Sequence, residues 1–264
     1  MKKKVIATLL CAAMVFSATA CGSKSKSLSP KEEYAAAVEK VNKAEGIDAD
    51  MDMTISMELS GMNMDIKMDG SILTNKRSDT DADLAMDATA EVMGQKIPMK
   101  YYYTDGYFYM EAADKKSKAK MDLEKAQEKI GGAAEMTNVQ AKMIKDVKVK
   151  DDGDNRVFTY KLDSKKMDEY VKKSMKSIGS LASGAASGTD IKIKGYKGTM
   201  TVDKDGNPVE QTVKMEITTS VKEQEITMKA DATVKYNKMG KDVKIEFPSF
   251  DGFKEVDANA LDQK

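Results

Sequence analysis

From residue 50 onward, apolar and polar side chains alternate along the chain with a period of two. That period is typical of a β-strand with one apolar and one polar face, and it leaves little room for an all-helical fold. The first run covers residues 51–59, where the odd-numbered side chains are Met, Ile or Leu. After the Ser60-Gly61 turn the pattern repeats over residues 62–68, so the two runs predict an antiparallel β-hairpin.

The same alternation recurs along the rest of the chain, with turn residues between the runs. It predicts nine further strands, at residues 82–92, 97–103, 107–111, 147–149, 157–160, 190–203, 208–219, 222–236 and 241–247. Apolar side chains at helical spacing predict helices at 30–45, 122–146 and 164–180, the second broken at Gly131-Gly132. The first helix opens with the capping-box sequence Ser29-Pro30-Lys31-Glu32.

Every long strand in this pattern has a single apolar face, and the helices are too few to form a bundle of their own. Both kinds of element therefore need each other to cover their apolar surfaces. The sequence predicts an α+β fold, in which a single curved antiparallel sheet of about eleven strands forms a half-barrel with helices packed in its concave face.

The N-terminal segment has the layout of a secretory signal. Three lysines precede an apolar run at residues 5–16, and small residues then lead to Cys21. We interpret residues 1–20 as a signal peptide and Cys21 as the lipidated residue of a bacterial lipobox, with plain secretion as the alternative. Residues 21–28 are then a polar tether, which predicts an exported protein anchored to the outer face of the cell membrane.

Residues 29–250 are predicted to form the folded domain, and residues 251–264 a C-terminal tail. The full chain holds 43 basic and 43 acidic residues, so loss of the three lysines of the signal leaves 40 against 43. A balance this close to neutral, slightly acidic, gives no basic face for nucleic acid, and we expect no nucleic-acid partner.

The composition also argues against catalysis. The chain has no histidine and only two cysteines, of which one, Cys11, lies in the predicted signal peptide. Histidine is the commonest general base and a frequent metal ligand, and a lone remaining cysteine forms no intrachain disulfide. We therefore expect a protein that is not an enzyme and has no cofactor and no metal site.

The order of helix, strands, helices, strands, helix and strands on a lipid-anchored exported chain resembles the LolA/LppX-type half-barrels. It is similar in the same way to Gram-positive surface lipoproteins of that type. The resemblance spans most of residues 29–250 and rests on the order of elements and turns, without a residue-level binding motif. It implies a half-barrel fold and an acyl chain or a lipidated partner held between sheet and helices.

Methionine supplies the first candidate binding surface, since the chain holds 21 of them and many fall on apolar strand faces. Flexible, polarisable methionines can line a deformable cavity for an acyl chain, or they can simply fill the core. A third reading, soft-metal binding by the Met51/Met53 and Met62/Met64 pairs, is opposed by their strand period. The residues predicted to line a ligand site are Met53, Ile55, Met57, Met64, Ile66, Met86, Met99, Tyr101, Met215 and Met228.

Two other groups have both a structural and a functional interpretation. Tyrosines cluster at residues 101–109, either as an amphipathic rim or as aromatic packing within a hairpin. Acidic turns at residues 151–155 and 203–207 offer closely spaced oxygen ligands for calcium. Neither fits an EF-hand loop, and hairpin turns require the same Asp, Asn and Gly residues.

Two functions follow from these observations. The first is a membrane-anchored exported lipoprotein that binds a hydrophobic ligand, a lipid or an acylated molecule, between sheet and helices. The alternative is a non-catalytic structural or interaction lipoprotein of the cell surface with a fully packed half-barrel. A contiguous apolar cavity of several hundred cubic ångströms would favour the first.

Overall fold

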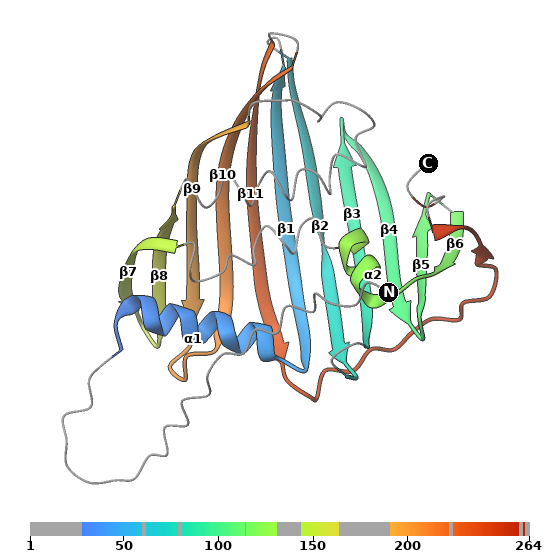
Figure 1. Cartoon of the computed structure of the whole chain (residues 1–264), viewed down its shortest axis with the longest axis horizontal. Helices are drawn as coiled ribbons and strands as arrows, with labels where there is room; N and C mark the ends of the chain where they lie inside the picture. Colours follow the sequence, from blue (N-terminus) through green and yellow to red (C-terminus); the bar gives the residue numbers. More distant parts are fainter. Residues whose placement is uncertain are drawn as a thin grey trace, which may run out of the picture.

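The computed structural model of the chain describes residues 28–59, 62–78, 81–113, 115–130, 144–163, 191–221, 224–258 and 261. These residues form one large, open and curved sheet of twelve strands and two helices (Figure 1). The helices are α1 (Pro30–Lys43) and α2 (Leu123–Ile130). The strands are β1 (Gly46–Leu59), β2 (Met62–Lys76), β3 (Ala82–Val92), β4 (Gln95–Thr104), β5 (Tyr107–Ala112), β6 (Lys115–Lys120), β7 (Ile144–Asp152), β8 (Asn155–Leu162), β9 (Ile191–Val202), β10 (Pro208–Val221), β11 (Gln224–Met239) and β12 (Lys254–Glu255).

The sheet consists of two meanders that meet at its centre. Its spatial order is β12-β6-β5-β4-β3-β2-β1-β11-β10-β9-β8-β7. Neighbouring strands are antiparallel except for β12 and β6, which are parallel. The single curved antiparallel sheet predicted from the sequence is therefore confirmed, and β1 joins the two meanders by pairing with both β2 and β11.

Strand register keeps the apolar side chains on one face across the centre of the sheet. Met57 lies opposite Met64 on β2 and Met228 on β11, and Ile55 lies opposite Ile66. We call this the helix-side face, because α1 and α2 pack on it. The opposite, outer face is polar and held by cross-strand pairs such as the Lys214–Asp231 ion pair, at 3.0 Å.

Helix α1 begins where its capping sequence predicts. The Ser29 hydroxyl accepts a hydrogen bond from the Glu32 backbone N–H, and the Glu32 carboxylate accepts one from the Ser29 N–H at 2.7 Å. Pro30 occupies the first helical position, where a missing N–H costs nothing. The buried side chains Tyr34, Ala37 and Val38 then face the sheet.

The buried core falls into three clusters along the helix-side face. One joins α1 to β7–β10 through Tyr34, Phe158 and Tyr160. Another joins α2 to β3–β6, and includes Phe108 and Ala126. The central cluster, on β1, β3 and β11, has only strand residues among its described members. The described helices therefore cover the two ends of the sheet.

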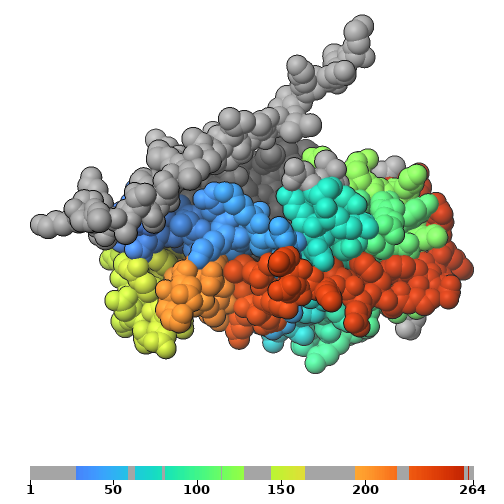
Figure 2. Space-filling view, turned by 90° about the horizontal axis from the view of Figure 1, so that it is seen from below, coloured from blue at the N-terminus to red at the C-terminus, as the bar shows by residue number. Residues whose placement is uncertain are grey.

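One strand prediction was wrong near the C-terminus. Residues 241–247 form no strand; the chain between β11 and β12 runs along one end of the sheet and leads to β12 beside β6 (Figures 1 and 2). Asn75 holds it by donating a hydrogen bond to the Val243 carbonyl at 2.9 Å. Phe250 then stacks on Tyr109 with ring centroids 3.8 Å apart, and β12 pairs with the edge of β6 within the predicted tail.

Differences also occur around α2. Of the helix predicted over 122–146, the described part is α2, Leu123–Ile130, and residues 144–146 belong to β7 instead. Residues 131–143, with the predicted Gly131-Gly132 break, lie outside the described residues, as does the helix predicted at 164–180. Strand β6 was not predicted, because its sequence, KKSKAK, has few apolar side chains; Ala119 alone is fully buried.

Gly198 on β9 provides a test of how α1 is seated. A methyl group on its Cα would overlap the ring of Tyr160, which packs against Tyr34 of α1. Gly198→Ala should therefore lower the free energy of unfolding by about 1–3 kcal/mol, the usual cost of overpacking, as measured by urea denaturation. Gly195→Ala, on the same strand with open space at its Cα, is the matched control. Equal losses in the two variants would contradict this packing.

Candidate functional site

Helix α1 is fastened to the sheet near both of its ends. Near its N-terminus, the Glu33 carboxylate forms an ion pair with the Arg156 guanidinium on β8 at 2.6 Å. Near its C-terminus, the Lys40 ammonium donates to the Asp205 carbonyl oxygen at 2.7 Å and to Asn207 Oδ1 at 3.0 Å. These contacts fix the helix across the ends of β8, β9 and β10, so that its inner face forms a wall above the sheet.

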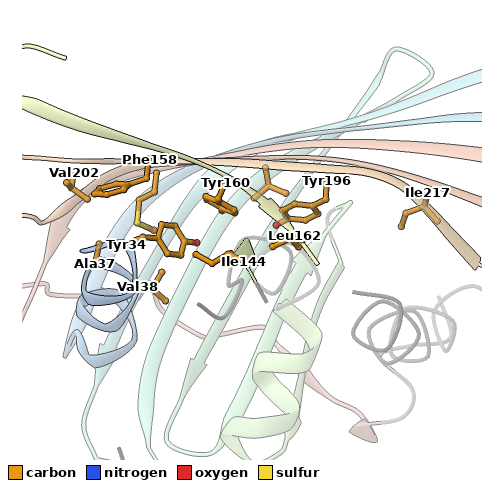
Figure 3. Packing of buried hydrophobic residues seen from close by; sticks show 12 residues of the cluster. Tyr34, Ala37, Val38, Ile144, Phe158, Tyr160, Leu162, Tyr196, Val202 and Ile217 are labelled. Atoms are coloured by element: carbon orange, nitrogen blue, oxygen red, sulfur yellow. The ribbon is translucent and has the colours of Figure 1, made fainter. Parts of the chain in front are cut away.

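Aromatic packing seals the space beneath the N-terminal part of α1. Tyr34 is completely buried, with its ring 4.7 Å from that of Tyr160 and 6.4 Å from that of Phe158, centroid to centroid (Figure 3). Burial and the neighbouring Tyr160 raise the pKa of the Tyr34 hydroxyl far above its ordinary value. This end of the interior is close-packed and neutral at physiological pH.

Helix α2 packs on the other half of the sheet. The Asp122 carboxylate accepts a hydrogen bond from the Lys125 N–H at 2.9 Å and so caps the first turn. Ala126 is fully buried against Leu84, Tyr103 and neighbouring side chains. The two described helices lie over different strands, and neither contributes a described residue to the core cluster of the central strands.

A cavity of about 470 Å³ lies between the two helices and the central strands. Most of its described lining is apolar, with Ile47 and Met51 from β1, Leu84 and Met86 from β3, and Val38 from α1. Cavities of roughly 300–1,000 Å³ with mainly apolar walls are the usual size for small-molecule sites. The lining residues Met51, Met86, Ala49 and Val234 belong to the central core cluster.

The exposed part of the lining differs from the interior. Asn42 of α1, Gln127 of α2, and Lys76 and Ser78 at the end of β2 are exposed and polar. Among the described lining residues they are the only exposed ones, so they mark the mouth of the cavity between the helices. The mouth is polar and exposed to solvent whereas the walls are apolar, an arrangement that suits an amphipathic ligand.

Three of the described wall residues that are not exposed are polar, namely Thr74, Gln211 and Tyr236. Gln211 on β10 is only 4% exposed, and its Nε2 donates to the Tyr160 hydroxyl at 3.2 Å. Its Oε1 accepts from the Tyr236 hydroxyl on β11 at 3.3 Å. Burial and the neighbouring Tyr160 raise the pKa of Tyr236 to about 12, so its hydroxyl stays protonated. The sequence analysis did not single out either residue; a glutamine in phase with Val213, Met215 and Ile217 was the available signal.

The residues predicted to line a ligand site share one face of the sheet. Met86 is among the described lining residues of the cavity. The other nine lie on the same face but are not among them. They are Met53, Ile55 and Met57 on β1, Met64 and Ile66 on β2, Met99 and Tyr101 on β4, Met215 on β10 and Met228 on β11. Met64 is 37% exposed, so the apolar surface continues beyond the cavity.

The tyrosine cluster divides between the two faces. Tyr101 and Tyr103 face the helices, whereas Tyr102 lies opposite Tyr109 on the outer face. Both outer tyrosines pack against Phe250 from the C-terminal segment, at centroid distances of 5.7 and 3.8 Å. These outer rings therefore belong to a packed aromatic cluster away from the cavity.

The acidic turn between β9 and β10 is closed by protein groups. The Asp203 carboxylate accepts hydrogen bonds from the Asp205 and Asn207 backbone N–H groups at 2.9 and 2.8 Å, which holds its pKa below the ordinary value. The Lys40 ammonium donates hydrogen bonds to two other oxygens of the turn, the Asp205 carbonyl oxygen and Asn207 Oδ1. Within the described ranges, no group of three acidic side chains converges as a metal site. Nor does a described helix have the length and hydropathy to span a membrane.

A family model described as a family of unknown function (DUF6612) matches residues 30–250. The chain belongs to this family. No curated protein matches the sequence. The match covers both described helices and eleven of the twelve described strands.

Solved structures that this chain is similar to include two mycobacterial proteins. LprF from Mycobacterium bovis is 9% identical with a TM-score of 0.43, over 83% of this chain and 97% of LprF. The lipoprotein LppX from Mycobacterium tuberculosis is 8% identical with a TM-score of 0.38, over 82% of this chain and 98% of LppX. Both are lipoprotein half-barrels, the type that the sequence resembles. At these scores the similarity says nothing about a ligand.

Lys40 tests the seating of the helix above the cavity. Lys40→Met keeps the aliphatic part of the side chain and removes both hydrogen bonds to the β9–β10 turn. We expect a loss of about 1 kcal/mol in unfolding free energy and faster amide hydrogen exchange in the last turns of α1. Lys43→Met, which loses an ion pair to Glu39 within the same helix, is the control. Unchanged exchange in Lys40→Met would show that this contact does not hold α1.

Proposed function

We propose that the protein is a membrane-anchored exported lipoprotein that binds a hydrophobic ligand, a lipid or an acylated molecule, between its sheet and helices. The observation that carries the proposal is the 470 Å³ cavity with apolar walls between α1, α2 and the central strands. Its mouth is lined by polar residues, so a ligand can bury its apolar part and leave a polar part near water.

Sequestration is the mechanism that this arrangement supports. Burial of an acyl chain gains about 0.8 kcal/mol per methylene group, so a chain of several methylenes binds usefully without specific polar contacts. The predicted lining methionines, which include Met53, Met57, Met64 and Met228, extend the apolar surface along the same face. Being flexible, they can adapt to chains of different length.

The alternative, a structural or interaction lipoprotein with a fully packed half-barrel, requires a filled interior. The packed clusters under α1 and α2 suit it, but the cavity over the central strands does not. The carrier is therefore the better supported of the two functions.

Native mass spectrometry with organic extraction tests the carrier function. Residues 29–264 contain every described helix and strand, and this part should be purified with a lipid at near-stoichiometric occupancy. Apolar burial at the central strands is the physical reason. An empty protein that also fails to bind added fatty acid, fatty alcohol and phospholipid would reject the proposal.

A matched pair of variants on β1 locates the ligand in the same experiment. Ala49 is fully buried and lines the cavity, so Ala49→Phe fills part of its volume and should lower lipid occupancy severalfold. Thr54 lies on the outer face of the same strand, and Thr54→Phe should leave occupancy unchanged. Equal occupancy in the two variants would place the lipid elsewhere.

Membrane anchoring has a separate test in the two cysteines of the chain. In bacteria that express the full-length protein and are fed radiolabelled palmitate, we expect label on the wild type and on Cys11→Ser. Cys21→Ser should lose it, because a thiol is needed to carry the lipid. Label that persists in Cys21→Ser would contradict lipidation at that residue.

A further inference from the structure

Three methionines form a row across the central strands. Met57 on β1 pairs directly with Met64 on β2 and with Met228 on β11. The three strands are neighbours at the centre of the sheet (Figure 1). Directly opposed residues on antiparallel strands have Cβ atoms about 4.5–5.5 Å apart on the same face of the sheet. The three thioethers therefore lie next to one another on the helix-side face.

Pairing across strands brings thioethers closer together than spacing along one strand does. Two same-face residues of one strand, such as Met51 and Met53, are about 7 Å apart along the strand. The cross-strand row has the shorter separation and supplies a third sulfur. The strand period, which opposes metal binding by the Met-x-Met pairs, is also the reason that these three side chains share a face.

The packing of the described residues does not account for the row. None of its three members is a described member of a buried cluster or of the cavity lining. Met57 and Met228 are half-buried, and Met64 is 37% exposed. Met57 lies six residues beyond the lining residue Met51 on β1, roughly 20 Å along the strand. The sulfur atoms are therefore accessible, at a place separate from the cavity.

The row offers soft, neutral ligands. The next pair along the same two strands, Ile55 opposite Ile66, is purely hydrocarbon. Glu58 follows Met57 by one residue, so its carboxylate lies on the outer face. Hard cations such as Mg²⁺ and Ca²⁺ need oxygen ligands, whereas thioethers select a soft ion such as Cu(I). The arrangement thus favours a soft metal ion over a hard one.

We propose that Met57, Met64 and Met228 form a three-thioether binding site for Cu(I). The two outer side chains are flexible and bend toward Met57, so that all three sulfur atoms contact one ion. A thioether has no proton to lose, so binding does not depend on pH, in contrast to sites built from cysteine, histidine or carboxylates. This inference goes beyond the proposed function and does not depend on it.

Titration with silver tests the site, because Ag(I) is a soft monovalent ion that needs no reductant. Residues 29–264 contain every described helix and strand and have neither cysteine nor histidine, so no thiol or imidazole competes. With silver nitrate in a chloride-free buffer, native mass spectrometry should show one bound ion per chain at equimolar silver. The affinity should be the same at pH 5.5 and pH 8.

Variants assign the ion to the row. Met57→Leu removes the central sulfur and nearly conserves volume, so it should weaken Ag(I) binding by at least about tenfold. Met64→Leu, at the exposed end, should do the same, and it carries the comparison if Met57→Leu does not fold. Met215→Leu is the matched control. Met215 lies on the same face, but its cross-strand partners are Ala230 and Tyr196, so this variant should bind as the wild type does.

The outcomes separate this site from the carrier function. One ion per chain, lost in Met57→Leu and Met64→Leu and kept in Met215→Leu, supports the inference. A wild type without a bound ion at equimolar silver, equal affinity in all three variants, a pH-dependent affinity, or displacement of silver by equimolar Zn²⁺ overturns it. Each of these results leaves the carrier function unaffected, because lipid occupancy is measured separately and without metal.

Discussion

The structure depends on the need to remove one continuous apolar face from water. Twelve strands at about 4.8 Å spacing give a sheet more than 50 Å wide, and α1, with 14 residues, is about 21 Å long. Within the described part of the chain, α1 covers β7–β10 and α2 covers β3–β6. The central strands between them carry the cavity. Among the described residues, the site thus lies between the parts of the sheet that the two helices cover.

Electrostatic contacts at the surface and apolar packing inside have different roles in this arrangement. The Glu33–Arg156 and Lys40 contacts are partly exposed and individually weak, but they fix the direction of α1. The buried rings of Tyr34, Tyr160 and Phe158 supply most of the stabilisation at that end. The polar contacts thus fix the direction of α1, and the aromatic rings fix its distance from the sheet. Together they keep the wall of the cavity in place when the interior is not completely filled.

Much of the sheet could be predicted because period-two alternation reports a local property of each strand, namely that one of its faces is polar and the other apolar. The capping box of α1 is equally local, and the start of the helix was predicted correctly.

Segment 241–247 has the alternation of a strand through Val243, Ile245 and Phe247. It is nevertheless held across the strand ends, by a hydrogen bond from Asn75 and by contact between Phe247 and Tyr102. Strand β6 was missed because its sequence has few apolar residues: it lies next to the edge strand β12, and Ala119 is its only fully buried side chain. The predicted methionines share the face of the site, but the position of the cavity depends on where α1 and α2 pack, which the strand pattern does not report. Gln211 and Tyr236 meet only through the pairing of β10 with β11.

The pairing of β1 with β11 also sets the order in which the sheet can be completed. Ile47 pairs with Met239 and Leu59 with Ile226, so these contacts join the beginning of the chain to its far end. Such non-local contacts slow folding, because a long loop must close before they form. During synthesis the meander β1–β6 can assemble first, with the edge of β1 unpaired until β11 has emerged. Charged side chains discourage pairing with a foreign strand, and β1 carries Asp48, Asp50 and Asp52 on its outer face. In the finished sheet Asp48 and Asp50 accept hydrogen bonds from Asn237 on β11. Before β11 has paired, the same three charges disfavour the pairing of the open edge with a foreign strand.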